Sequence, residues 1–464
     1  MKKQLIALAA AAAIAPAAFA GNASFGGDAN VEGYALRANT DVTDGTEADS
    51  RGYTNRIRVK GTYKTDGNVS VNTRIILNDS NWTGDNHSEG VQGVYQNSAN
   101  DAVAVDYGFI QAPILGWTFR FGRQVANWGN CFLTCDDRRD RILAMKRFGS
   151  TTIIFLNDKR AGGSLTSSTD EINVGYDDVN GNGEYDAGDN LTYSEGFSTG
   201  YSADETADTG EGDLYTAAAV GVINGWQWGL LLGKWMGEES YILDEVYAIS
   251  PFFKGKAGPV KLEGTLNILG GGNEEGGAAF TDTAVSAYVK AGMNVSTVLI
   301  EGQVVVVSGG GLVAGGFDTF SMFVNNSPDN NLSNVAQLNP VYGLVNMLGG
   351  LGQIGASEGA GRAYADDQYM LGFRVSGKAG KIGWKAAMTY LNSEDSMDDL
   401  GIDYAHDFNL TTFEGGITYD VAKSTQVYLN AGIGTLEQTA AALGSSATAE
   451  IDLQAATIGI NTTF

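Results

Sequence analysis

The chain ends in the run Ala456-Thr457-Ile458-Gly459-Ile460-Asn461-Thr462-Thr463-Phe464. Counting back by twos from Phe464 places this ring, Ile460 and Ile458 on one face, because successive side chains of a strand point to opposite faces. Thr462 and Ala456 share that face. The run therefore predicts a terminal β-strand with one mostly apolar face.

This terminal strand resembles the C-terminal signal strand by which outer-membrane β-barrels of Gram-negative bacteria are recognised and inserted. The other end of the chain agrees with an exported protein. Lys2 and Lys3 precede an apolar stretch, and Ala18-Phe19-Ala20 is a small-x-small cleavage site. Residues 1–20 are therefore predicted to be a signal peptide. A transmembrane helix is not expected here, because the apolar stretch is shorter than the roughly 20 residues that such a helix needs.

Composition favours a barrel for the rest of the chain. Glycine accounts for 64 of 464 residues, proline for only 6, and aromatic residues for 10%. A disordered chain would be poorer in aromatic residues, and no apolar run after residue 20 is long enough for a transmembrane helix. We expect residues 21–464 to form one all-β domain, a transmembrane antiparallel β-barrel in the outer membrane of a Gram-negative bacterium. A soluble β-sandwich or β-helix is the alternative.

The chain alternates between tight turns and long polar segments, as a barrel requires. In one example Tyr53, Ile57 and Val59 alternate with arginines before the turn Thr65-Asp66-Gly67-Asn68. About eighteen strands are expected, with sixteen as the alternative, and an aqueous lumen follows from that number. The predicted strands lie at 29–39, 52–64, 69–78, 101–111, 117–123, 139–148, 150–157, 213–223, 226–236, 244–254, 260–269, 282–292, 298–308, 367–377, 381–391, 409–420, 425–435 and 450–464.

Long outer loops are expected near 124–138, 158–212 and 309–366, with the lumen partly filled by loops that fold inward. Aromatic bands facing the lipid should include Tyr63, Trp117, Trp384 and Tyr390. The chain carries a formal charge of −25, so nucleic acid is not an expected partner.

Basic residues fall at inward positions of the early strands. A charge on the lipid face at mid-depth costs about 2–4 kcal/mol, so these side chains should face the lumen. Either they pair with acidic neighbours inside, or they form a cationic ladder that attracts anions. The candidate pore-lining residues are Arg56, Arg58, Lys60, Arg74, Asp106, Arg120, Arg123, Asp137, Arg138 and Asp140.

The segment Phe121-Gly-Arg-Gln124, with Trp128-Gly129 and the Arg/Asp cluster at 136–141, is similar to a stretch in several porin-like families, including alginate-export-type barrels. The similarity covers some twenty residues and assigns no substrate. It implies that the third outer loop folds into the pore and supplies constriction residues; a surface loop with self-paired charges is the alternative. Cys131 and Cys135 are expected to form a disulfide. They do not form a Cys-x-x-Cys-His haem motif.

Residues 178–189 resemble an EF-hand-type calcium loop, with oxygen-bearing residues at the ligand positions and Gly183 at position 6. Asp189 stands where glutamate is usual, and no helices flank the loop. The surrounding residues 161–213 contain thirteen acidic and no basic residues, which a bound Ca²⁺ would order; an acidic turn without an ion is the alternative. The candidate ligands are Asp178, Asn180, Asn182, Glu184, Asp186 and Asp189.

These features predict a porin, a passive outer-membrane channel for small hydrophilic solutes or ions. The alternatives are a structural sheath or surface-binding barrel, such as one enclosing a cytochrome, and an exported soluble calcium-binding β-protein. An enzyme is not expected, because neither His87 nor His406 lies in a recognisable catalytic constellation. A homo-oligomer such as a trimer, or a surface protein partner, stays open beside the lipid and the solute.

We expect Ca²⁺ to protect residues 161–213 from proteolysis, because an unliganded cluster of carboxylates repels itself. Asp178→Ala should remove this protection while leaving the barrel intact, and the affinity should be on the order of 10⁻⁴–10⁻³ M, as in extracellular modules. Limited proteolysis in the presence of calcium or of a chelator measures this protection. Equal cleavage rates in the two conditions would reduce the motif to an acidic turn.

Overall fold

The structure is a computed structural model that describes residues 21–40, 47–65, 67–81, 104–130, 132–161, 174–177, 190–193, 212–237, 245–271, 284–308, 367–394, 408–439 and 448–464. Eighteen strands form one sheet, and two short strands, β8 (Val174–Asp177) and β9 (Asn190–Tyr193), form a second. The first seven are β1 (Gly21–Thr40), β2 (Glu47–Thr65), β3 (Ser70–Asn81), β4 (Ala104–Ile114), β5 (Trp117–Trp128), β6 (Thr134–Phe148) and β7 (Thr151–Ala161).

The remaining strands of the large sheet continue in chain order. They are β10 (Gly212–Ile223), β11 (Trp226–Gly237), β12 (Val246–Ala257), β13 (Val260–Gly271), β14 (Ala284–Val295), β15 (Val298–Ser308), β16 (Asp367–Ala379), β17 (Ile382–Glu394), β18 (Phe408–Ala422), β19 (Thr425–Thr439) and β20 (Thr448–Thr463).

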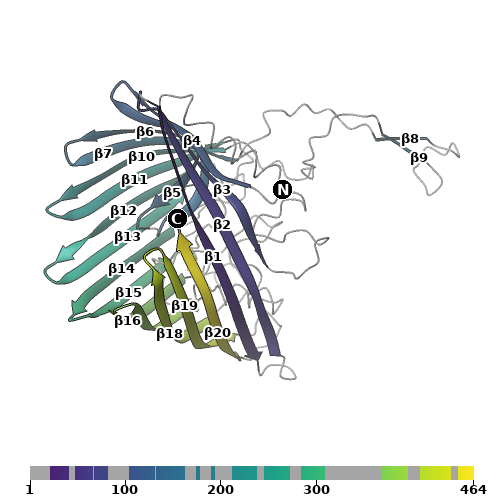
Figure 1. Ribbon diagram of the computed structural model, residues 1–464, viewed down its shortest axis with the longest axis vertical. Coiled ribbons are helices and arrows are strands. Elements are labelled where there is room, and N and C mark those ends of the chain that lie inside the picture. Colours follow the sequence, from purple (N-terminus) through teal and green to yellow (C-terminus); the bar gives the residue numbers. More distant parts are fainter. Residues whose placement is uncertain are drawn as a thin grey trace.

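The large sheet closes on itself, since β1 pairs with both β2 and β20 (Figure 1). The β1–β20 register runs from Asp28 opposite Thr463 to Thr40 opposite Ile451. Past its end, the Gly27 amide donates to the Phe464 carbonyl over 2.8 Å, and the Phe464 amide donates back over 3.1 Å. All strand pairs are antiparallel, so the predicted all-β, closed antiparallel barrel is confirmed and the sandwich alternative is wrong.

Each of the eighteen predicted strands coincides with one strand of the barrel. The largest difference at an end is in β1, which begins at Gly21 rather than near residue 29. Residues 21–28 lack an apolar alternation, yet their backbone pairs with residues 58–65 of β2. No helix among the described residues is long and apolar enough to cross a membrane.

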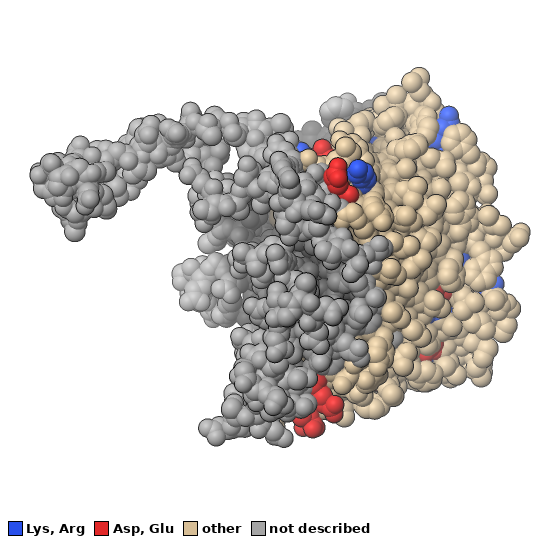
Figure 2. All heavy atoms as spheres, turned by 180° about the vertical axis from the view of Figure 1, so that it is seen from behind, with Lys and Arg blue, Asp and Glu red and all other residues tan. Residues whose placement is uncertain are grey.

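The outward face of the barrel is apolar. Large hydrophobic side chains such as Leu371, Phe413 and Ile433 are half exposed there, and Figure 2 shows a wall with few charged side chains. Aromatic residues gather toward both ends. At one end, turns of two to four residues join the strands; this end carries Trp117, Phe148, Trp226, Trp384 and Tyr419. The end with the longer connections carries Tyr53, Tyr215, Tyr247, Tyr369 and Tyr390.

The four aromatic residues predicted for these bands all lie in the outward phase. Trp384 pairs across strands with Ile417, and Tyr390 pairs with Leu371. Tyr63 pairs with Val71, and Trp117 pairs with Ile114, which are both exposed hydrophobic residues. The alternation of apolar and polar positions therefore identified the outward face correctly.

β8 (Val174–Asp177) and β9 (Asn190–Tyr193) form an antiparallel pair of their own. The innermost pair is Asp177 opposite Asn190, so the strands close the twelve-residue segment 178–189. This segment holds the six candidate calcium ligands and lies outside the described residues.

Charge on the outward face should destabilise the barrel according to its depth. Ala431 of β19 is exposed between the aromatic bands, opposite Gly415, whereas Thr435 on the same face lies at the level of Thr411 and Tyr390. We expect Ala431→Arg to cost about 2–4 kcal/mol of folding free energy and Thr435→Arg about 0–1 kcal/mol. Denaturant titration in lipid bilayers measures both, and equal costs would contradict this placement of the membrane.

Candidate pore constriction

The β5–β6 hairpin leaves the barrel wall. β4 pairs with β5 only as far as Gly108 opposite Arg123, and β7 pairs with β6 only as far as Asp140 opposite Lys159. Beyond these points residues 124–139 pair only with each other. We call this part the inward hairpin.

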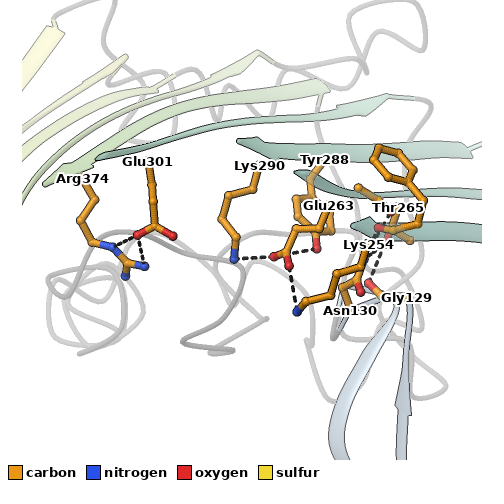
Figure 3. A network of polar contacts seen from close by, with 11 residues as sticks. Gly129, Asn130, Lys254, Glu263, Thr265, Tyr288, Lys290, Glu301 and Arg374 are labelled. Atoms are coloured by element: carbon orange, nitrogen blue, oxygen red, sulfur yellow. Dashed lines mark hydrogen bonds and ion pairs between the residues drawn. The ribbon is translucent and has the colours of Figure 1, made fainter. Parts of the chain in front are cut away.

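The tip of the inward hairpin is bonded to strands on another part of the wall (Figure 3). The Trp128 indole donates to the Ser250 carbonyl over 3.0 Å, and the side-chain amide of Asn130 donates to the Phe253 carbonyl over 3.1 Å. The Thr265 hydroxyl donates to the Gly129 carbonyl over 2.6 Å. β7, β10 and β11 separate β6 from β12 around the barrel. The hairpin therefore projects into the lumen and docks on β12 and β13.

Aromatic contacts add to these hydrogen bonds. The Phe132 ring lies 4.7 Å from the Tyr288 ring of β14, and the Trp128 ring lies 5.2 Å from Phe252 of β12. Phe132, Leu133 and Tyr288 are all almost fully buried. The tip is thus packed as well as bonded, which fixes its position across the lumen.

The tip turns through two residues with positive φ, Gly129 at 62° and Asn130 at 55°. A Cβ atom on Gly129 would lie 2.7 Å from Thr265 Cγ2, so the close approach to β13 also requires glycine. Only residues 129–133 separate β5 from β6. The long loop expected near 124–138 is mostly strand, since β5 runs to Trp128 and β6 begins at Thr134. The inward folding that the resemblance implied is seen in the hydrogen bonds from the tip to β12 and β13.

Two buried carboxylates hold the base of the inward hairpin. Asp106 of β4 is bonded to Arg74 of β3 and, over 2.5 Å, to Arg138 of the hairpin. Asp158 of β7 accepts two bonds from Arg141, of 2.6 and 2.7 Å, and one of 3.2 Å from Arg139. Both carboxylate side chains have no exposed surface. Since a buried carboxylate needs such partners, these clusters lock the hairpin to the wall on both sides.

Other predicted pore-lining residues lie in the inward phase of β2 and β5. Arg58 pairs with Asp28 at 2.8 Å, and the Arg120 guanidinium donates to the Gln111 side chain over 2.8 Å. Arg56 and Lys60 lie two residues to either side of Arg58 along β2 and share its phase. Several of the predicted basic residues are therefore paired inside the barrel.

Arg123 and Asp140 do not line the lumen. They pair with each other at 3.6 Å in the outward phase of Phe121 and Ile142, and are 44% and 62% exposed. Lys159 and Asp213 continue this row onto β7 and β10 with an ion pair of 3.8 Å. The prediction for Arg123 and Asp140 is wrong because the hairpin leaves the wall just beyond them.

Cys131 and the side chains of Cys135 and Asp137 lie outside the described residues.

The opposite wall carries charges that the sequence analysis did not single out (Figure 3). Glu263 of β13 pairs with Lys290 at 2.5 Å and with Lys254 at 2.9 Å. Glu301 of β15 pairs with Arg374 of β16 at 2.6 Å. Each carboxylate is separated in sequence from most of its partners, and only the strand register brings them together. The one signal available in the sequence was that these residues occupy inward positions on five consecutive strands, β12 to β16.

Comparisons with known proteins identify the fold alone. No protein-family profile matches the sequence, and no curated protein does. The outer membrane protein OpdK of Pseudomonas aeruginosa is similar with a TM-score of 0.52 at 11% identity, over 95% of this chain and 99% of that one. P. aeruginosa OccK9 (OpdG) has a TM-score of 0.53 at 8% identity, and Acinetobacter baumannii OccAB3 has 0.52 at 10%, each with the same coverage. The chain therefore has a porin-like outer-membrane barrel fold.

Gly129→Ala should detach the tip of the inward hairpin, because the added methyl group meets Thr265 at a backbone conformation that alanine disfavours. Gly149→Ala is the matched control, since Gly149 has a similar φ of 59° and open space around it. Hydrogen exchange in peptides covering 124–138 should accelerate at least about tenfold in Gly129→Ala, equivalent to about 1.4 kcal/mol. Equal protection in the two variants would show that the contact with Thr265 does not hold the tip.

Proposed function

We propose that this protein is a passive diffusion channel of the Gram-negative outer membrane for small hydrophilic solutes. The observation that carries the proposal is the inward hairpin, which narrows a closed barrel and is bonded to the strands across the lumen. A barrel that only displayed a surface loop would gain nothing from such a brace.

The two faces of the wall support a membrane-spanning channel. The outward face is apolar between two aromatic bands, as lipid requires. The inward face carries hydrogen-bonded polar groups and ion pairs. An eighteen-stranded barrel is wide enough for an aqueous lumen. In the proposal the short turns face the periplasm and the long connections face outward.

The constriction combines rigid geometry with fixed charge. The arginines at the base of the inward hairpin keep their carboxylate partners, so their positions do not depend on a passing solute. Solute size would then be limited by the hairpin, and solute charge by the inward residues of β2 and β3. A crystal structure of OpdK with vanillate shows that one protein of similar fold was solved with a small organic acid.

We also propose that residues 178–189 bind Ca²⁺. The β8–β9 pair supports this, because it brings the two ends of the twelve-residue segment together without flanking helices. Hard Ca²⁺ takes six to eight oxygen ligands, which the side chains and carbonyls of such a loop can supply.

If the protein is a channel, the purified protein should produce conductance steps when it inserts into planar bilayers. Arg56→Ser with Arg58→Ser should shift the reversal potential toward cations, because two positive charges leave the lumen and Asp28 loses its partner. Arg123→Ser is the matched control, since this arginine lies on the outward face and should leave selectivity unchanged. Inserted protein without conductance would contradict the channel. A shift in the Arg123→Ser control equal to that of the double variant would contradict the assignment of the lumen.

A further inference from the structure

A cavity of about 600 Å³ lies at the turn end of the barrel, on the inner wall formed by β11 to β15. It is lined by Asn224 and Gln227 and by four lysines, Lys254, Lys256, Lys261 and Lys290. Two glutamates, Glu263 and Glu301, are the only acidic residues of its lining. In a chain with a formal charge of −25, this is a local excess of positive charge.

Both glutamates are already engaged by other groups. Glu263 is shared between Lys254 and Lys290, and Glu301 takes both of its short bonds from Arg374. Within the part of the chain that the structure describes, no ion pair includes Lys256 or Lys261. These two lysines therefore keep their charge uncompensated by the cavity's own carboxylates.

Lys256 and Lys261 lie directly opposite each other on β12 and β13. They share the inward phase of the Lys254–Glu263 pair, which lies two residues further along the same two strands. Like charges at opposed positions of an antiparallel pair destabilise a sheet. On the next strand the neighbour of Lys261 is Gly292, which carries no side chain. Beyond Gly292 lies Glu301, whose carboxylate is bonded to Arg374.

We propose that Lys256 and Lys261 bind a doubly charged oxyanion of the phosphate class. One dianion cancels both charges, and lysine binds phosphate as a mobile point charge. The Asn224 and Gln227 side chains supply further hydrogen-bond donors at the cavity. Because the site faces the lumen rather than the lipid, its ligand is a water-soluble phosphate or phosphorylated solute and not a membrane headgroup. The site adds a ligand to the proposed channel, and its test does not need conduction.

The test is binding of inorganic phosphate to the full-length mature protein in detergent micelles, followed by ³¹P line broadening at neutral pH. Lys256→Gln with Lys261→Gln should weaken binding by about tenfold or more, the change expected for about 1.4 kcal/mol. Lys378→Gln is the matched control, since Lys378 also lies at the turn end and is exposed but pairs with Asp420. A phosphate monoester such as glycerol phosphate should compete, whereas chloride at equal ionic strength should not.

Unchanged broadening in the double variant would overturn the proposal, and so would an equal loss in Lys378→Gln, which would indicate only general electrostatic attraction. Full competition by chloride would exclude a dianion site. Retained heat resistance of the folded band on electrophoresis shows that each variant still forms the barrel. A bilayer experiment without conductance would contradict the channel and leave this binding result standing.

Discussion

Every backbone amide and carbonyl that crosses a lipid bilayer must find its partner within the protein, because hydrocarbon offers none. A sheet meets this requirement only when it has no edge. The seam between β1 and β20 is therefore the pairing on which the barrel depends, and it is continued to the last residue by the two bonds between Gly27 and Phe464. The outward apolar face and the inward polar face follow once the sheet is closed, since alternate side chains then meet different solvents.

The inward hairpin is the one place where strands leave this arrangement. Beyond Arg123 and Asp140 neither strand faces lipid, so both faces of residues 124–138 can carry polar groups. The departure is stabilised at the base by Asp106 and Asp158, and at the tip by β12, β13 and β14. Removing either carboxylate would take a buried ion-pair partner from two arginines of its cluster, which costs more than the pair itself contributes. The constriction is thus held at both ends by groups that tolerate little change.

The strands were predictable because lipid imposes a strict period of two on one face. The hairpin strands 124–128 and 134–138 escaped prediction because that constraint ends where they leave the wall, and their sequence is read as a polar loop. Arg123 was misplaced for the same reason. Lys254, Lys261, Glu263 and Lys290 form no local motif and meet only through register. The inward face of Arg58 and Arg74 was predictable, but the choice between pairing and a free cationic ladder required the positions of Asp28 and Asp106.

The seam also sets the order in which the molecule can be assembled. Asn30 of β1 and Asn461 of β20, whose side chains are bonded to each other, are 431 positions apart in the chain. The entropic cost of closing a loop of this length rises only with the logarithm of its length, so the seam is affordable at equilibrium. It is nevertheless unavailable until the last strand has been made. Until then β1 has an open edge that can pair with strands of other chains. The unfolded chain must therefore be protected from aggregation between its export and its insertion into the membrane.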